Sequence, residues 1–137
     1  MPIPFVDTDV IVRLITGDDP IKQQAPRALF KLAEDGQIEV AAPITMIADA
    51  VYVLGSPRLY GLPREAVASA LRTLVRIPAF HVHNRHAVLR ALSIYGSTKL
   101  DFGDAFILAL MEAGNSTVLY SYDRGFDRVV AISRREP

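Results

Sequence analysis

The stretch Ile3-Pro4-Phe5-Val6-Asp7 is a short apolar run that stops at an acid. Such a run, closed by a polar residue, is typical of a buried strand that ends in a turn. The most strand-like segment of the chain, residues 117–121, is followed in the same way, because Asp123 lies two residues beyond Ser121. Ligands of open parallel sheets lie outside the carboxyl ends of the strands. We therefore expect Asp7 and Asp123 to face one crevice.

Helix and strand signals alternate along the rest of the chain. Strand followed by helix followed by strand forces crossover connections, which give a parallel sheet with helices on both faces. No linker, internal repeat or low-complexity segment divides the chain, so the sequence predicts a single α/β domain over residues 1–137 with a central, mainly parallel sheet. Apolar spacing and cap residues predict helices at 10–15, 20–35, 43–54, 63–77, 84–95 and 103–113, and further strands at 38–42, 80–82 and 129–132.

Composition restricts the possible chemistry. The chain has no cysteine, which excludes disulfides, thiolate metal sites and a cysteine nucleophile, so any metal must be bound by oxygen or histidine. The N-terminus lacks the basic region of a signal peptide, and charged residues interrupt the long apolar runs. We therefore expect a soluble protein of the cytoplasm with no membrane span.

The net charge of zero conceals an uneven distribution of charge. Residues 1–50 carry 4 basic and 8 acidic side chains (−4), residues 51–100 carry 7 and 1 (+6), and residues 101–137 carry 4 and 6 (−2). This pattern can place a cation site beside a phosphate-binding face. A solvated helical surface that bears arginines explains it equally well.

Four acidic positions carry the candidate chemistry. Asp104 lies in the first turn of a predicted helix, and Asp49 lies inside an apolar helix, where we expect it to be buried and to need a cation or an arginine as its partner. Carboxylates that converge repel one another, and Mg²⁺ or Mn²⁺ relieves this repulsion because these cations prefer oxygen ligands. Such a site suits metal-assisted hydrolysis of a phosphodiester.

Four short motifs contain these acids. In their order and spacing they resemble the PIN-domain family, and in particular the small VapC-type toxins of bacterial and archaeal toxin–antitoxin pairs. The resemblance extends from residue 5 to about residue 130. The motifs are Phe5-Val6-Asp7-Thr8-Asp9, Asp49-Ala50-Val51-Tyr52-Val53-Leu54, Asp101-Phe102-Gly103-Asp104-Ala105 and Ser121-Tyr122-Asp123-Arg124-Gly125-Phe126.

The resemblance implies an endoribonuclease that depends on Mg²⁺ or Mn²⁺, cleaves RNA, forms a homodimer and is inhibited by an antitoxin protein. By position, Asp7, Asp104 and Asp123 would bind the metal, and Asp49 stands where the family usually has glutamate. The predicted supporting residues are Thr8, Asp9, Asp101 and Ser121, and the predicted RNA-binding residues are Arg72, Arg76 and Lys99.

Three other interpretations remain open at this point. Asp7-Thr8-Asp9 after a strand resembles the nucleophile motif of haloacid-dehalogenase-like phosphatases, with Lys99 available as a later lysine. A PIN domain that has lost catalysis could act as a binding module. His81, His83 and His86 have a spacing that could suggest zinc, although imidazoles on an exposed strand edge explain it as well.

Overall fold

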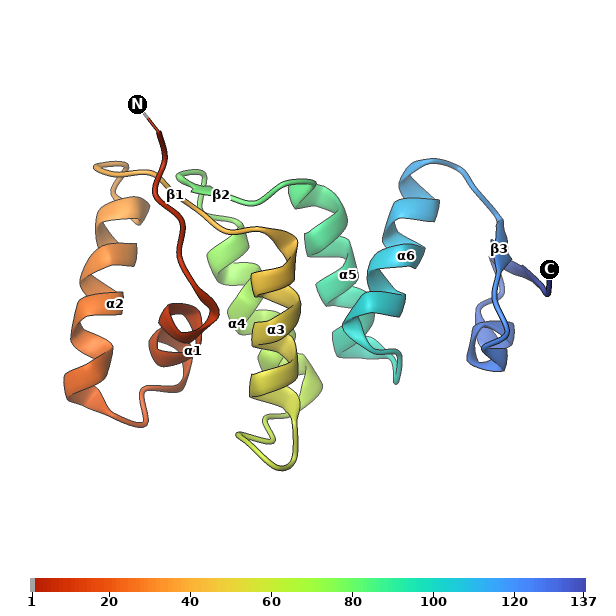
Figure 1. The fold of residues 1–137 in the computed structure, drawn as a ribbon, viewed down its shortest axis with the longest axis horizontal. Coiled ribbons are helices and arrows are strands. Elements are labelled where there is room, and N and C mark those ends of the chain that lie inside the picture. Colours follow the sequence, from red (N-terminus) through yellow and green to blue (C-terminus); the bar gives the residue numbers. More distant parts are fainter. Residues whose placement is uncertain (1) are drawn as a thin grey trace.

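The computed structural model of the chain describes residues 2–137. Its helices lie side by side in an elongated row, and the C-terminal segment stands at one end of that row (Figure 1). The strands are β1 (Val40–Ala41), β2 (Phe80–His81), β3 (Val118–Tyr120) and β4 (Ser133–Arg135). The helices are α1 (Thr8–Thr16), α2 (Pro20–Glu34), α3 (Ile44–Gly55), α4 (Arg64–Val75), α5 (Arg85–Ser97), α6 (Phe102–Ala113) and the 3₁₀ helix η1 (Arg124–Arg128).

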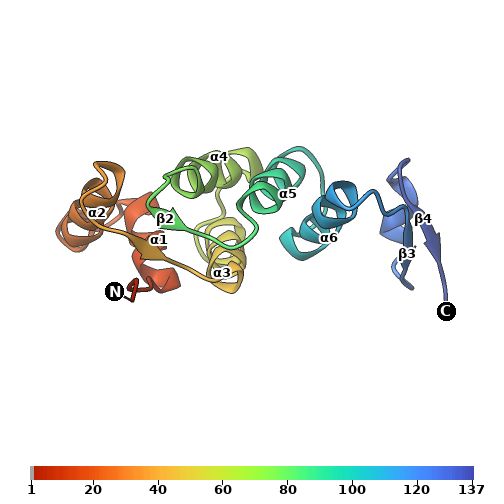
Figure 2. The same ribbon diagram turned by 90° about the horizontal axis from the view of Figure 1, so that it is seen from above.

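The strands pair in parallel, as the alternation of elements predicts. β1 pairs with β2, with Val40 opposite Phe80, and the N-terminal stretch adds a parallel bridge from Phe5 to Ala41. β3 pairs with β4, with Leu119 opposite Arg134. The α/β class of the fold is confirmed, and its strands form two small sheets of two strands each. Figure 2 shows these sheets in different parts of the molecule, with helices between them.

The predicted helices are all present, whereas the last strand is displaced from the prediction. The sequence predicts a strand at residues 129–132, but the structure places β4 at Ser133–Arg135. Val129 and Ile132 pack against Phe126 in a small cluster, and Val130 between them points into solvent. These apolar residues therefore belong to a turn that covers η1, and the strand begins after it.

One large core holds the helices together. α4 and α5 lie against each other, as do α5 and α6, through apolar residues at helical spacing. Phe80 of β2 is fully buried, and its ring meets that of Phe30 of α2 edge to face, with the ring centroids 5.3 Å apart. This contact ties the strand pair to the helix that flanks it.

The C-terminal unit, residues 118–135, comprises β3, η1 and β4. It packs on α6 through a second, smaller cluster in which Phe126 is buried with Leu108 and Met111 of α6. Exposed residues 114–117 connect it to that helix. No helix within residues 2–137 is long and apolar enough to cross a membrane.

Candidate metal and nucleic-acid site

Three of the four predicted metal-binding acids lie at the N-terminus of a helix. The Oδ1 atom of Asp7 accepts a hydrogen bond from the Thr8 N–H at 2.7 Å at the start of α1. Asp123 accepts from the Gly125 N–H at 2.8 Å at the start of η1. The third, Asp104, lies in the first turn of α6, which Asp101 caps. Carboxylates suit these positions because a helix N-terminus carries partial positive charge.

Asp104 lies in a field of negative charge. Its backbone N–H donates to Oδ1 of Asp101 at 2.8 Å, so the two side chains are held on the same turn. Partial burial raises the pKa of the Asp104 carboxyl above its ordinary value, and repulsion from Asp101 and Asp123 raises it further. The structure therefore brings Asp101, Asp104 and Asp123 close enough for their charges to interact, which is the situation that a bound cation would relieve.

The raised pKa of Asp104 predicts how stability depends on pH when a chelator removes divalent cations. The folded protein holds the Asp104 proton more tightly than the unfolded chain does. The free energy of unfolding therefore falls as pH rises from the ordinary aspartate pKa of 3.8 through the raised pKa of Asp104. Asp104→Asn should remove this loss and raise the free energy of unfolding at neutral pH by less than about 1 kcal/mol, since the group is largely solvated. Urea unfolding of both proteins at several pH values measures the difference, which should vanish below the ordinary range. Asp9→Asn, at an exposed acid in α1, serves as the control.

The expectation that Asp49 is buried is wrong. Asp49 is exposed on α3. The helix buries Ile47, Ala50 and Leu54, so the apolar neighbours of Asp49 in the sequence point to the other side of the helix. Solvent stabilises the carboxylate, and Asp49 therefore needs no arginine beside it.

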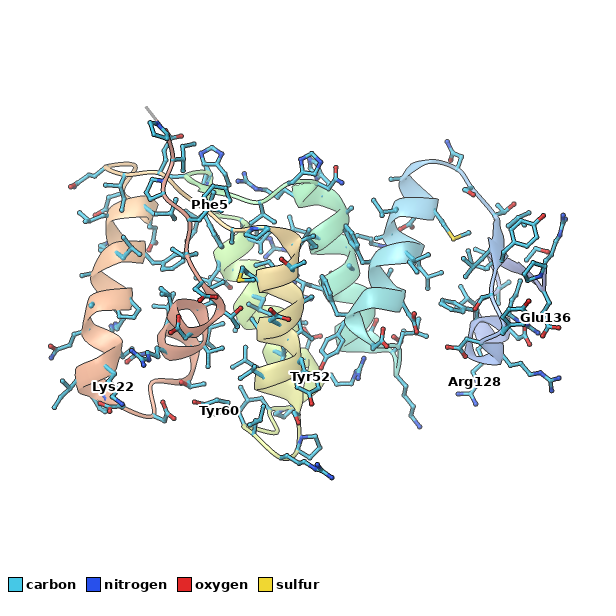
Figure 3. The ribbon with its side chains drawn as sticks, in the orientation of Figure 1. Phe5, Lys22, Tyr52, Tyr60, Arg128 and Glu136 are labelled. Atoms are coloured by element: carbon cyan, nitrogen blue, oxygen red, sulfur yellow. The ribbon has the colours of Figure 1, made fainter. Side chains whose placement is uncertain are left out.

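Neither Asp7 nor Asp49 is among the acids whose charge raises the pKa of Asp104. Their helices, α1 and α3, contact each other, and the Thr8 hydroxyl donates to Sδ of Met46 at 3.2 Å. Figure 3 shows Phe5, just before Asp7, far from Arg128 in the C-terminal unit. No group of three or more histidine, aspartate or glutamate side chains within residues 2–137 is placed to hold a metal ion. Within one chain, these carboxylates do not form a complete set of metal ligands.

The loop that carries Asp123 is held by residues that the sequence motifs do not reveal. The Asp123 N–H donates to Oγ of Ser121 at 3.0 Å. Arg134 of β4 donates to the Ser121 carbonyl at 2.9 Å and forms an ion pair with Asp127 of η1 at 2.7 Å. Arg134 thus contacts one residue before Asp123 and one after it and so holds the loop in place. Nothing in the residue spacing of the sequence connects Arg134 with Asp123.

The predicted RNA-binding residues lie in different environments. Arg72 is mostly buried between α4 and α5, where it forms an ion pair with Glu65 at 2.8 Å. Arg76 is exposed at the C-terminal end of α4. Lys99 is exposed and lines a cleft together with Tyr52 of α3 and Asp101. Of the three, Arg76 and Lys99 have cationic groups that phosphate can reach.

The histidine cluster has a structural explanation. His81 of β2 lies 2.8 Å from a carboxylate oxygen of Glu39, and His83 and His86 are exposed. These three side chains are not among any metal-binding group in the part of the chain that the structure describes. The three histidines are therefore explained as exposed imidazoles at and beside the edge of strand β2.

Comparison with known families gives one result. The family model described as PIN domain matches residues 5–132, and this range contains all four acids. No curated protein matches the chain.

Proposed function

This chain belongs to the PIN-domain family, whose members are generally nucleases that use divalent metal ions, and from that membership we propose that it is a Mg²⁺- or Mn²⁺-dependent endoribonuclease. The main observation behind this proposal is the acidic group at α6, where the Asp104 N–H donates to Asp101 and where partial burial, together with repulsion from Asp101 and Asp123, raises the pKa of Asp104. Clustered acids with a perturbed pKa are typical of functional sites. The phosphatase alternative loses its basis, because the motif at Asp7 now belongs to the family pattern.

The proposed metal ligands are the carboxylates of Asp7, Asp104 and Asp123. Asp49 is proposed to support the metal through a bound water. All offer the hard oxygen atoms that Mg²⁺ and Mn²⁺ prefer. A bound divalent ion supplies Lewis acidity and an activated water for phosphodiester hydrolysis. The proposed supporting residues hold the ligands in place: Asp101 caps α6, and Ser121 fixes the loop of Asp123.

The RNA backbone is proposed to lie over the basic middle of the chain. Arg76 and Lys99 are exposed cations, and Tyr52 stands beside Lys99 in the same cleft. Lysine and arginine supply the sequence-independent part of nucleic-acid affinity through contacts with phosphate. Arg72 can contribute only if it leaves Glu65, so its effect on RNA affinity should be the smallest of the three.

The physiological role that we propose is the toxin of a type II toxin–antitoxin pair, in which a cognate antitoxin protein covers the acidic site. Support comes from the resemblance of the four motifs to VapC-type toxins and from the match of residues 5–132 to the PIN-domain family. In this proposal the whole chain acts as one nuclease domain in the cytoplasm.

Cleavage of RNA by the purified protein tests the proposed activity. A panel of structured RNAs, with DNA of the same sequences as controls, is incubated with Mg²⁺, with Mn²⁺ or with chelator. We expect defined RNA fragments with either metal and none with chelator. Equal cleavage with and without metal, or cleavage by Asp104→Asn at the wild-type rate, would show that the activity does not come from this site.

The second candidate is a binding module without catalysis, and two observations favour it. Asp49 replaces the usual glutamate, and within residues 2–137 the acids do not gather into a metal-binding group. RNA binding that persists without any cleavage identifies this alternative. In that case Arg76→Ala and Lys99→Ala should each lower RNA affinity for all sequences alike and reduce the salt dependence by about one unit per phosphate contact.

A further inference from the structure

Arg64 connects α4 with the place where α5 ends and α6 begins. The start of α4, the end of α5 and the start of α6 lie at the same end of the helical row (Figure 1). Arg64 is the first residue of α4; its Nε atom donates to the Tyr95 carbonyl at 2.9 Å, and a terminal nitrogen donates to the Leu100 carbonyl. Its guanidinium also lies over the Tyr95 ring, 3.9 Å from the ring centroid. These contacts hold the half-buried side chain in one place.

The turn between α5 and α6 receives its contact with α4 from this arginine. Residues 98–101 form the turn. Thr98 ties it to α5, since the Thr98 hydroxyl donates to the Ile94 carbonyl at 2.7 Å and accepts from the Leu100 N–H at 3.2 Å. Within residues 2–137, the bond from Arg64 to Leu100 is the one hydrogen bond that reaches this turn from outside α5 and α6. Arg64 therefore determines how the turn lies relative to α4.

The carbonyl that Arg64 binds directly precedes the acids of α6. It belongs to the peptide group between Leu100 and Asp101. Asp101 caps the helix, and its Oδ1 atom accepts from the Asp104 N–H at 2.8 Å. The buried Phe102 anchors the start of α6 in the core, but it leaves the peptide group before the cap to be oriented by Arg64. The arginine thus acts on the backbone next to the residue that holds the acidic turn.

The charge of Arg64 is directed at main-chain carbonyls. The Tyr95 carbonyl is one of the last four of α5, which lack a partner within the helix and carry partial negative charge. In the part of the chain that the structure describes, Arg64 forms no ion pair, whereas Arg72 of the same helix pairs with Glu65. A guanidinium suits this place, because its planar fork donates in two directions while its face stacks on an aromatic ring.

We propose that Arg64 is a positioning residue for the acidic group at α6. Its two hydrogen bonds and its stack on Tyr95 hold the turn in the conformation that presents Asp101 and Asp104. The part of this inference that concerns metal and RNA rests on the proposed nuclease function. Arg64 also lines the cleft that contains Lys99, so a direct contact with RNA phosphate is the competing explanation.

Arg85 offers a matched control for Arg64. It is the first residue of α5, is half-buried like Arg64, and donates to the Phe80 and Pro78 carbonyls at 2.6 and 3.3 Å. Residues 78–80 follow the C-terminal end of α4, whereas Arg64 lies at the N-terminal end of that helix. Arg85→Ala therefore removes the same kind of contact without touching the turn that precedes Asp101.

Amide hydrogen exchange of the metal-free protein, followed by NMR, tests the positioning without any assay of RNA cleavage. The Asp104 N–H reports on the turn, because it is bonded to Oδ1 of Asp101. Hydrogen bonds from charged groups oppose local opening by about 10-fold or more, so Arg64→Ala should speed exchange of this N–H by about that factor. Arg85→Ala should leave it unchanged. Exchange at the wild-type rate in Arg64→Ala would overturn the proposal.

Arg64→Lys separates the geometry of the side chain from its charge. Lysine keeps the positive charge, but its single ammonium group cannot reproduce the planar fork and its stack on Tyr95. We expect the Asp104 N–H to exchange faster than in wild type and more slowly than in Arg64→Ala. The same variant tests the proposal if Arg64→Ala does not fold. Exchange at the wild-type rate in Arg64→Lys would contradict the proposal, since charge alone would then hold the turn.

Metal affinity tests the consequence for the proposed site. Residues that orient metal ligands contribute about 10- to 100-fold in metal affinity. Arg64→Ala should therefore weaken Mn²⁺ binding by about 10-fold, and Arg85→Ala should not change it. Electron paramagnetic resonance of free Mn²⁺, in the absence of RNA, measures both. Equal Mn²⁺ affinities of Arg64→Ala and wild type would show that the position of the turn does not matter to the metal.

RNA binding in the presence of chelator separates positioning from a direct phosphate contact. A positioning role leaves the salt dependence of RNA affinity unchanged in Arg64→Ala. A salt dependence lower by about one unit would identify Arg64 as a phosphate contact and overturn the proposal. Faster exchange of the Asp104 N–H in Arg64→Ala, when wild type binds no Mn²⁺ and cleaves no RNA, would leave the positioning of the turn standing and refute the proposed function.

Discussion

Replacing Asp104 with asparagine is expected to lower the rate of RNA cleavage by more than about 100-fold, because residues that only support a metal ligand already contribute 10- to 100-fold. The substitution keeps the size and position of the side chain in the first turn of α6 but removes the charge that interacts with Asp101 and Asp123. Initial rates at several Mn²⁺ concentrations, with circular dichroism as a check on folding, measure the loss.

Asp49 provides the matched comparison for Asp104. Its carboxylate is one methylene shorter than the usual glutamate and so retreats by about 1.5 Å, more than a direct Mg²⁺–oxygen bond tolerates. We expect it to act through a bound water, so Asp49→Asn should lower activity by about 10- to 100-fold. The exposure of Asp49 leaves room for Asp49→Glu, which should remain active. If Asp49→Asn were as damaging as Asp104→Asn, Asp49 would be a direct ligand and not a supporting residue.

Replacing Phe80 with alanine should lower the free energy of unfolding by about 3–5 kcal/mol, the largest stability change that we expect from a single substitution. Phe80 is fully buried and its ring packs edge to face on that of Phe30, so alanine would leave a cavity between β2 and α2. Urea unfolding measured by circular dichroism, at one fixed protein concentration, gives the change.

Ile21→Ala is the control for this prediction. Ile21 is an apolar residue of α2 that is 80% exposed, so its truncation should change the free energy of unfolding by no more than about 0.5 kcal/mol. Equal losses for Phe80→Ala and Ile21→Ala would mean that the contact between β2 and α2 contributes little to the stability of the fold.

The helices could be predicted from the sequence because their signals are local. Apolar residues at helical spacing, with Pro20 at the start of α2 and Asp101 as the cap of α6, predict each helix to within a few residues. The order of the acids is just as local, since each acid follows a strand or lies in a helix that the pattern predicts. The fold class therefore follows from short-range patterns, whereas the roles expected of the candidate residues come from the resemblance of the four motifs to the PIN-domain family.

Features that depend on distant contacts could not be predicted in this way. The burial expected for Asp49 failed because an apolar segment does not reveal which face of its helix meets the core. The division of the strands into two sheets follows from the packing of Phe126 on α6, which lies outside the strands themselves. The ion pair of Arg134 with Asp127 likewise becomes visible only once β4 and η1 are side by side.

The packing of α4, α5 and α6 on their neighbours in the sequence also has a consequence for the order of events during synthesis. Helices that contact adjacent segments form early, because little chain entropy is lost in closing short loops. By contrast, the pairing of β1 with β2 joins Val40 to Phe80, and the C-terminal unit is synthesised after all six α-helices. The helices that precede α6 can thus begin to pack before Asp123 emerges, and the acidic group at α6 is completed only after them.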